Sequence, residues 1–265
     1  EPPPDAPPPP APPLVVTILP GAAVVQTAAF WALLDAGKGL GSFMEKQGAP
    51  HPLCWLMMTR FQEPAFTEIS ATGKILAARA RLNVAGPDDA DASLQQWGPR
   101  MCATLPDKSR ASPLLFPQRE GEFSLAPGAR AVTRYTQHPG TCLAYRLEAQ
   151  SRSLVYCPAH EVPPDLAKIN PHEHEKFRDL FEEADLVLHG FRRSLTEEPP
   201  KDAHGRGAWE PVVDLCARAL VKHLVLLPQA GASVEGIQWR AEERLHALGS
   251  SMRVSVSPYD ERVIL

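Results

Sequence analysis

The chain has 265 residues and a formal net charge of −4 at pH 7. This nearly balanced charge argues against electrostatically driven binding to nucleic acid. No run of about 18 apolar residues is present that would span a membrane, so we expect no membrane partner. The five cysteines are far apart and odd in number, which predicts reduced, mostly buried thiols in a cytoplasmic protein rather than a disulfide framework or a zinc knuckle.

The chain opens with nine prolines in thirteen residues. Proline cannot donate the hydrogen bonds of a sheet and favours an extended polyproline conformation. We therefore expect residues 1–13 to form a proline-rich linker that connects an upstream module to one domain at residues 14–265. A ligand for a proline-recognising domain is the alternative interpretation of this segment.

In the first half of the domain, hydrophobic patterning predicts strands at 14–19, 24–29, 30–35 and 53–58, and a helix at 40–47 that begins on a glycine-rich turn. Strand-like segments follow at 74–81 and 82–85. Helical spacing of Leu94, Trp97 and Met101 behind acidic residues predicts a helix over 88–102. Residues 103–118 contain several prolines and little periodicity, which predicts a surface loop.

The second half changes its pattern. Strands are predicted at 123–125, 129–136, 142–148 and 154–157, as a meander with a turn at Pro127-Gly128. Helices and strands then alternate, with helices at 171–183, 211–221 and 234–248 and strands at 186–189, 223–227 and 252–256. Hairpins that give way to α/β crossovers predict an α/β protein built as an αββα sandwich.

Several segments together carry a family resemblance. The glycine-rich turn lies in Trp31-Ala32-Leu33-Leu34-Asp35-Ala36-Gly37-Lys38-Gly39-Leu40, and a strand ending in Met57-Met58-Thr59 follows it. Further segments with recognisable motifs follow along the chain at His138-Pro139-Gly140-Thr141, 154–161, 184–190, 205–208 and 224–229. Their order and motifs resemble the metallo-β-lactamase fold, in the branch that holds phosphodiesterases and tRNA-processing nucleases.

The resemblance also implies that the metal ligands have been replaced. Thr59 falls on the threonine that the family follows with His-x-His-x-Asp-His, so the four ligand positions are occupied by Arg60, Gln62, Pro64 and Ala65. Arginine has a fixed positive charge and no acceptor atom, and proline and alanine have no side-chain donor atom. His138 is the one ligand retained. The family's later site positions are occupied here by Ala159, Gly190, Ala208, Pro228 and Gln229.

We therefore expect a catalytically inactive domain that acts in regulation or protein interaction, with no cofactor and no catalytic residue. The expected partner is another protein or a second copy of this chain. An anionic small molecule is a further expected ligand, because guanidinium groups bind phosphate and carboxylate bidentately. Candidate ligand-binding residues in the former metal cleft are Arg60, Gln62, His138, His189 and Arg206. A salt bridge from Arg60 to Glu63 or Glu68 is the alternative role for that arginine.

Two other functions stay open. One is a metal-dependent phosphodiesterase with a relocated site, built on His138 with recruits from Glu161, His160, His189 and His204. The other is a structural scaffold whose cleft is filled by Phe61, Phe66 and Trp209. The His172 and His174 pair is expected to mark an exposed helix start, since residues two apart on a helix point about 200° apart.

Overall fold

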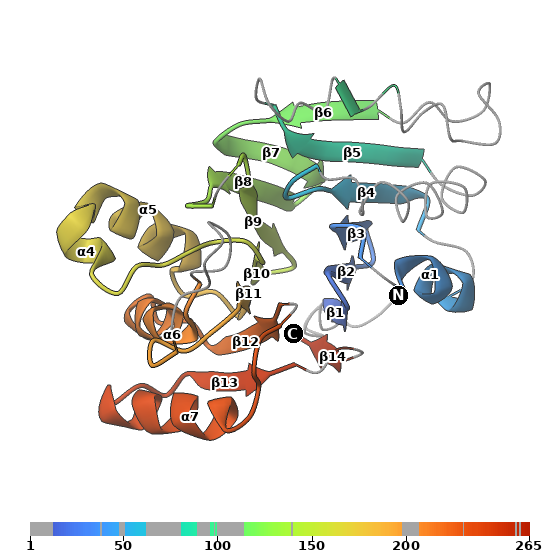
Figure 1. Ribbon diagram of the computed structural model, residues 1–265. Coiled ribbons are helices and arrows are strands. Elements are labelled where there is room, and N and C mark those ends of the chain that lie inside the picture. The colour runs from blue at the N-terminus through green and yellow to red at the C-terminus, as the bar shows by residue number, and fades with distance from the viewer. Residues whose placement is uncertain are drawn as a thin grey trace, which may run out of the picture.

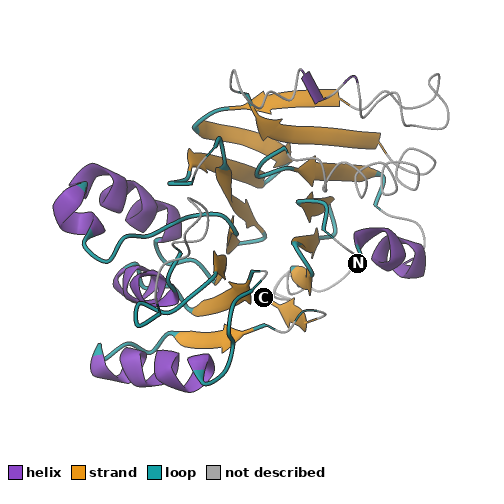
Figure 2. Ribbon diagram, in the orientation of Figure 1, coloured by secondary structure: helices purple, strands orange, loops and turns teal. Residues whose placement is uncertain are grey.

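The computed structural model describes residues 13–37, 39–47, 51–61, 81–88, 96–97, 99, 114–138, 140–197, 207–229, 231–257, 259 and 261–265. Two sheets face each other, and helices cover their outer faces (Figures 1 and 2). The predicted αββα sandwich is therefore confirmed. The predicted linker lies outside the described residues except for its last position, so the boundary at residue 14 stays a prediction. No helix in the described ranges is long and apolar enough to cross a membrane.

The first sheet has the order β14-β1-β2-β3-β4-β5-β6. Its strands are β1 (Val15–Leu19), β2 (Ala22–Gln26), β3 (Trp31–Leu34), β4 (Leu53–Met57), β5 (Arg81–Pro87), β6 (Leu114–Gln118) and β14 (Glu261–Ile264). Strands β3 to β6 run parallel to one another. Helix α1 (Leu40–Gln47) connects β3 with β4 and buries Leu40 and Met44 against the outer face of the sheet.

The second sheet has the order β13-β12-β11-β10-β9-β8-β7. Its strands are β7 (Gly121–Ala126), β8 (Ala129–Tyr135), β9 (Leu143–Ala149), β10 (Arg152–Cys157), β11 (Leu186–Phe191), β12 (His223–Pro228) and β13 (Arg253–Val256). The outer helices are α4 (Leu166–Ile169), α5 (Pro171–Phe181), α6 (Trp209–Arg218) and α7 (Ile237–Ala247). Strands β7 to β10 form the predicted antiparallel meander, and β10 to β13 are the predicted parallel crossovers.

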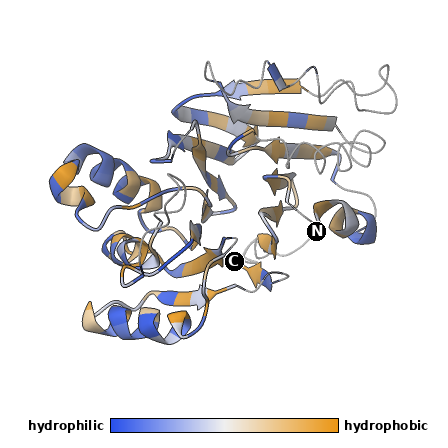
Figure 3. Cartoon of the chain, in the orientation of Figure 1, coloured by the Kyte–Doolittle hydropathy of each residue, from blue (hydrophilic) through white to orange (hydrophobic). Residues whose placement is uncertain are grey.

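The main core lies between the sheets, because alternate side chains of a strand point to opposite faces. In β2, Ala23 and Val25 enter this core while Val24 packs towards α1. Trp55 crosses between the sheets, where its Nε1–H donates to the Leu125 carbonyl at 3.0 Å. Figure 3 shows largely apolar strands, with many hydrophilic residues on α5 and α7.

The structure corrects the predicted loop at 103–118, because Leu114–Gln118 forms β6. In the described part of the chain this strand pairs only with β5, and proline is tolerated at a sheet edge, which is why Pro117 does not prevent the strand. Strand β14 and the short helix α4 were also not predicted. Residues 74–80 and most of 88–102 lie outside the described residues, although Gln96 and Trp97 are helical. The described cysteines are free, buried thiols, as predicted.

Candidate functional site

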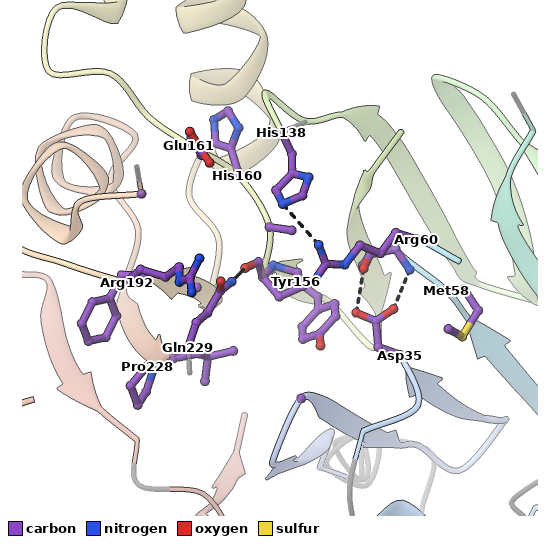
Figure 4. Close-up of a pocket in the computed structure, with 18 of the residues that line it drawn as sticks. Asp35, Met58, Arg60, His138, Tyr156, His160, Glu161, Arg192, Pro228 and Gln229 are labelled. Carbon is purple, nitrogen blue, oxygen red and sulfur yellow. Dashed lines mark hydrogen bonds between the residues drawn. The ribbon is translucent and has the colours of Figure 1, made fainter. Parts of the chain in front are cut away.

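A cavity of about 450 Å³ opens where parallel strands of both sheets end. Its walls come mainly from the segments that follow β3, β4 and β10, at residues 35–36, 58–60 and 158–161, and from the ends of β11 and β12, at residues 190–192 and 227–229 (Figure 4). We call it the strand-end cavity. Carboxyl ends of parallel strands meet at one edge of a sheet, and this edge is the usual place for a ligand in α/β proteins. The strand-end cavity is therefore the candidate site.

One wall is organised by Asp35, which follows β3. Its carboxylate accepts hydrogen bonds from the Thr59 backbone N–H at 2.6 Å and from the Thr59 hydroxyl at 2.7 Å. Burial raises the pKa of Asp35 to about 6, while the Thr59 hydrogen bonds and the charge of Arg60 act in the opposite direction. Asp35 thereby joins the ends of β3 and β4.

The loop after β4 is also bonded to the second sheet. The buried Tyr145 hydroxyl donates to the Met58 carbonyl at 2.7 Å, and the Leu143 backbone N–H donates to the Thr59 carbonyl at 2.8 Å. These bonds fix the backbone immediately before Arg60. The side chain of Arg60 therefore enters the cavity from a rigid support.

Arg60 contacts His138, and the two residues are 78 positions apart in the sequence. The Arg60 guanidinium nitrogen lies 3.2 Å from Nε2 of His138 (Figure 4). Because a guanidinium group only donates hydrogen bonds, Nε2 of His138 is the acceptor. The structure thus brings together two of the predicted site residues.

The opposite wall is closed at Gly190. A Cβ atom at this position would overlap the Pro158 carbonyl oxygen and lie 2.6 Å from Nε2 of Gln229. That amide group donates to the same Pro158 carbonyl, and the Gln229 backbone N–H donates to the Phe191 carbonyl at 2.9 Å. The Gln229 side chain therefore passes over position 190 and leaves room only for glycine.

A second arginine lines the cavity from this wall. The backbone N–H of Arg192 donates to the Gly207 carbonyl at 2.9 Å, which holds the turn after β11. Figure 4 shows Arg192 and Arg60 on opposite sides of the cavity, with Tyr156 between them. Two guanidinium groups thus line one cavity.

The other predicted residues lie in different places. His189 is fully buried behind the wall, where its ring packs against Phe181 and His160. Gln62 and Arg206 lie outside the described residues, as do Glu63 and Glu68. Of the residues expected in a filled cleft, Trp209 is instead buried between the second sheet and its helices, Phe61 stacks on Trp97, and Phe66 is not described.

Asp35 and Tyr156 also line the cavity, although neither was predicted as a site residue. Asp35 had a usable signal, since it is a carboxylate directly after a buried strand. Its left-handed backbone, with φ of 59°, fits the tight turn that the sequence did predict. Tyr156 had no such signal, because a tyrosine within an apolar strand is usually a core residue.

Two facing seven-stranded sheets with helices on their outer faces match a solved metallo-β-lactamase fold structure over nearly the whole chain, so this chain has that fold. It is similar over 96% of its length to the whole of the metallo-β-lactamase fold protein YhfI from Bacillus subtilis, with 17% identity and a TM-score of 0.70.

Two further solved structures agree. The short form of human tRNase Z matches 94% of this chain and 98% of its own, with 13% identity and a TM-score of 0.63. Igni18, a metallo hydrolase from Ignicoccus hospitalis, matches 96% of this chain and 99% of its own, with 11% identity and a TM-score of 0.61. No protein-family model and no curated protein sequence matches the chain. At such low sequence identities, these similarities show the fold alone.

Proposed function

We propose that this domain is a non-hydrolytic binding module that takes an anionic ligand in the strand-end cavity. The observation that carries the proposal is the guanidinium group of Arg60 inside the cavity, bonded to Nε2 of His138 at 3.2 Å. Regulation or protein interaction is the biological role that fits such a domain, and a cytoplasmic location stays a prediction.

The residues described at this site do not fit the metal centre that the fold suggests. The acceptor nitrogen of His138 faces a permanent cation, which a metal ion would have to displace. Ala159 has no donor atom, and the packing around Gly190 leaves no room for any side chain. Within the described ranges, no three His, Cys, Asp or Glu residues are grouped so that they could hold a metal ion.

An anion fits the same residues better. Arg60 and Arg192 approach from opposite walls, and charge-assisted hydrogen bonds from guanidinium groups to phosphate or carboxylate oxygens are among the stronger ones in proteins. The volume of about 450 Å³ lies in the range of small-molecule sites. Asp35 also lines the cavity, but its carboxylate oxygens are engaged by Thr59.

Thermal unfolding in sulfate, pyrophosphate and nucleotides tests the proposal. A ligand at about 100 times its Kd should stabilise the folded state by about 2.7 kcal/mol through mass action. Arg60→Gln should remove most of this gain. Arg178→Gln is the matched control, because Arg178 lies on α5 and pairs with Glu175 away from the cavity. An unchanged gain in the Arg60 variant would refute the assignment of the site.

Metal content and turnover test the alternative of a hydrolase with a relocated site. We expect protein purified without chelators from metal-supplemented medium to contain only a trace of zinc, manganese or iron. Stoichiometric metal together with phosphodiesterase turnover would favour the hydrolase and overturn our proposal. Absence of both metal and anion stabilisation would favour the structural scaffold.

A further inference from the structure

Two buried histidines lie side by side at the strand-end cavity, where His160 is part of the wall and His189 lies behind it. His160 follows β10 and is 2% exposed, and His189 lies in β11 and is 0% exposed. Their ring centroids are 5.9 Å apart in an edge-to-face arrangement. In the described part of the chain, Nε2 of each ring is buried without a hydrogen-bond partner. Such atoms are rare in folded proteins, because leaving them unsatisfied is costly.

Hydrogen bonds to the other ring nitrogens determine which atoms carry protons. Nδ1 of His160 is 3.1 Å from the Gln137 backbone N–H, so it must present a lone pair. Nδ1 of His189 is 2.8 Å from the Gly190 carbonyl, which can only accept, so it must carry a hydrogen. In the neutral rings, Nε2 of His160 is therefore a donor and Nε2 of His189 an acceptor.

Burial favours the neutral form of both rings. Burial lowers the pKa of His160 well below its ordinary value, and the neighbouring His189, Lys176 and His138 act in the same direction. Burial also lowers the pKa of His189 to about 4, although its bond to the Gly190 carbonyl opposes this shift. The two unsatisfied atoms are thus complementary, but they do not bond to each other directly.

We propose that one water molecule binds between these rings, accepting from Nε2–H of His160 and donating to Nε2 of His189. Water suits the site because it can accept and donate at once, and it commonly satisfies pairs of buried polar atoms. A metal ion fits poorly, since it would need the lone pair of His160 Nε2 and would move the hydrogen to Nδ1, against the Gln137 N–H. An anion fits poorly as well, because His189 offers it only a lone pair.

The bound water ties the cavity wall to the second sheet. His160 belongs to segment 158–161, and the next residue donates its backbone N–H to the Gln137 carbonyl at 2.8 Å. Gln137 is thus held on both sides, by His160 and by Glu161, immediately before His138. The His160 ring also stacks on Phe177 of α5, with centroids 3.7 Å apart. The water site is independent of whether the cavity binds an anion.

Nuclear magnetic resonance of protein carrying ¹⁵N-labelled histidine tests the inference directly. Long-range proton–nitrogen correlations at pH 7 should show opposite tautomers, with the hydrogen on Nε2 in His160 and on Nδ1 in His189. A high-resolution crystal structure should show a water within hydrogen-bond distance of both Nε2 atoms. The same tautomer in both rings, a cationic ring, or a metal ion in place of the water would overturn the proposal.

His189→Leu provides a second test, because it removes the acceptor and keeps an apolar side chain of similar bulk. We expect the water to be lost and the Nε2–H signal of His160 to disappear through faster exchange with solvent. His172→Leu, at an exposed position on α5, is the control and should leave that signal unchanged. A persistent signal in a folded His189→Leu variant would contradict the bridge. If that variant does not fold, the wild-type tautomers and crystal structure decide.

Discussion

Replacing Gly190 by alanine should destabilise the domain from inside the cavity wall. The added Cβ atom would overlap the Pro158 carbonyl oxygen, which belongs to the backbone and cannot rotate away, and would lie 2.6 Å from Nε2 of Gln229. Overpacking a close-packed site costs about 1–3 kcal/mol, and losing the Gln229 hydrogen bond to Pro158 adds about 0.5–1.5 kcal/mol. We expect a total loss of about 1.5–4.5 kcal/mol in the free energy of unfolding.

Urea unfolding measures this loss, and a thermal scan should show a fall in Tm of about 2–4 °C for each kcal/mol. Gly207→Ala is the matched control in the same cavity, because its Cβ would meet its nearest neighbour, the His160 carbonyl oxygen, at an ordinary 3.7 Å. Adding Gln229→Ala should not rescue Gly190→Ala, since the overlap with the Pro158 carbonyl remains. Equal stability of the two glycine variants would refute the packing argument.

Three further substitutions test the supports of the site. Asp35→Asn removes the carboxyl group whose pKa is raised to about 6 in the folded state. The unfolding free energy of the wild type should therefore fall relative to that of the variant as pH rises from about 4 to about 6, by on the order of 2–3 kcal/mol. Above about pH 6 the difference should level off. A pH-independent difference would contradict this. Tyr145→Phe should cost about 1–2 kcal/mol and weaken anion stabilisation, because the loop before Arg60 loses its bond to the second sheet. Trp55→Phe should cost a similar ~1–2 kcal/mol by denaturation, whereas Trp239→Phe, at a 64% exposed position, should be neutral.

The architecture was largely predictable from local patterns. Short apolar runs mark most strands of both sheets, and the glycine turn at residues 37–39 marks the start of α1. The change from hairpins to crossovers predicted the meander of β7 to β10 and the parallel strands after it. These signals come from neighbouring residues, so they can be recognised without knowing the fold.

The missed elements depended on distant partners. Strand β14 is a short segment whose hydrogen bonds are made with β1, at the other end of the chain. Strand β6 contains Pro117 and is only partly buried, which are properties of an edge strand that sequence alone does not distinguish from a loop. Both became strands because a paired neighbour satisfies their backbone groups.

The patterning of the sequence alone predicted the fold class and the positions of most elements, and its resemblance to the metallo-β-lactamase fold predicted that Arg60 and His138 share a cleft. Only the tertiary structure decided how these residues meet. Three features depend on segments that are distant in the chain. They are the contact of Arg60 with His138, the crowding of Gly190 by Pro158 and Gln229, and the burial of His189 behind the cavity wall. Periodicity reports which face a side chain occupies, whereas hydrogen-bond partners and free volume depend on how the two sheets and their loops pack together.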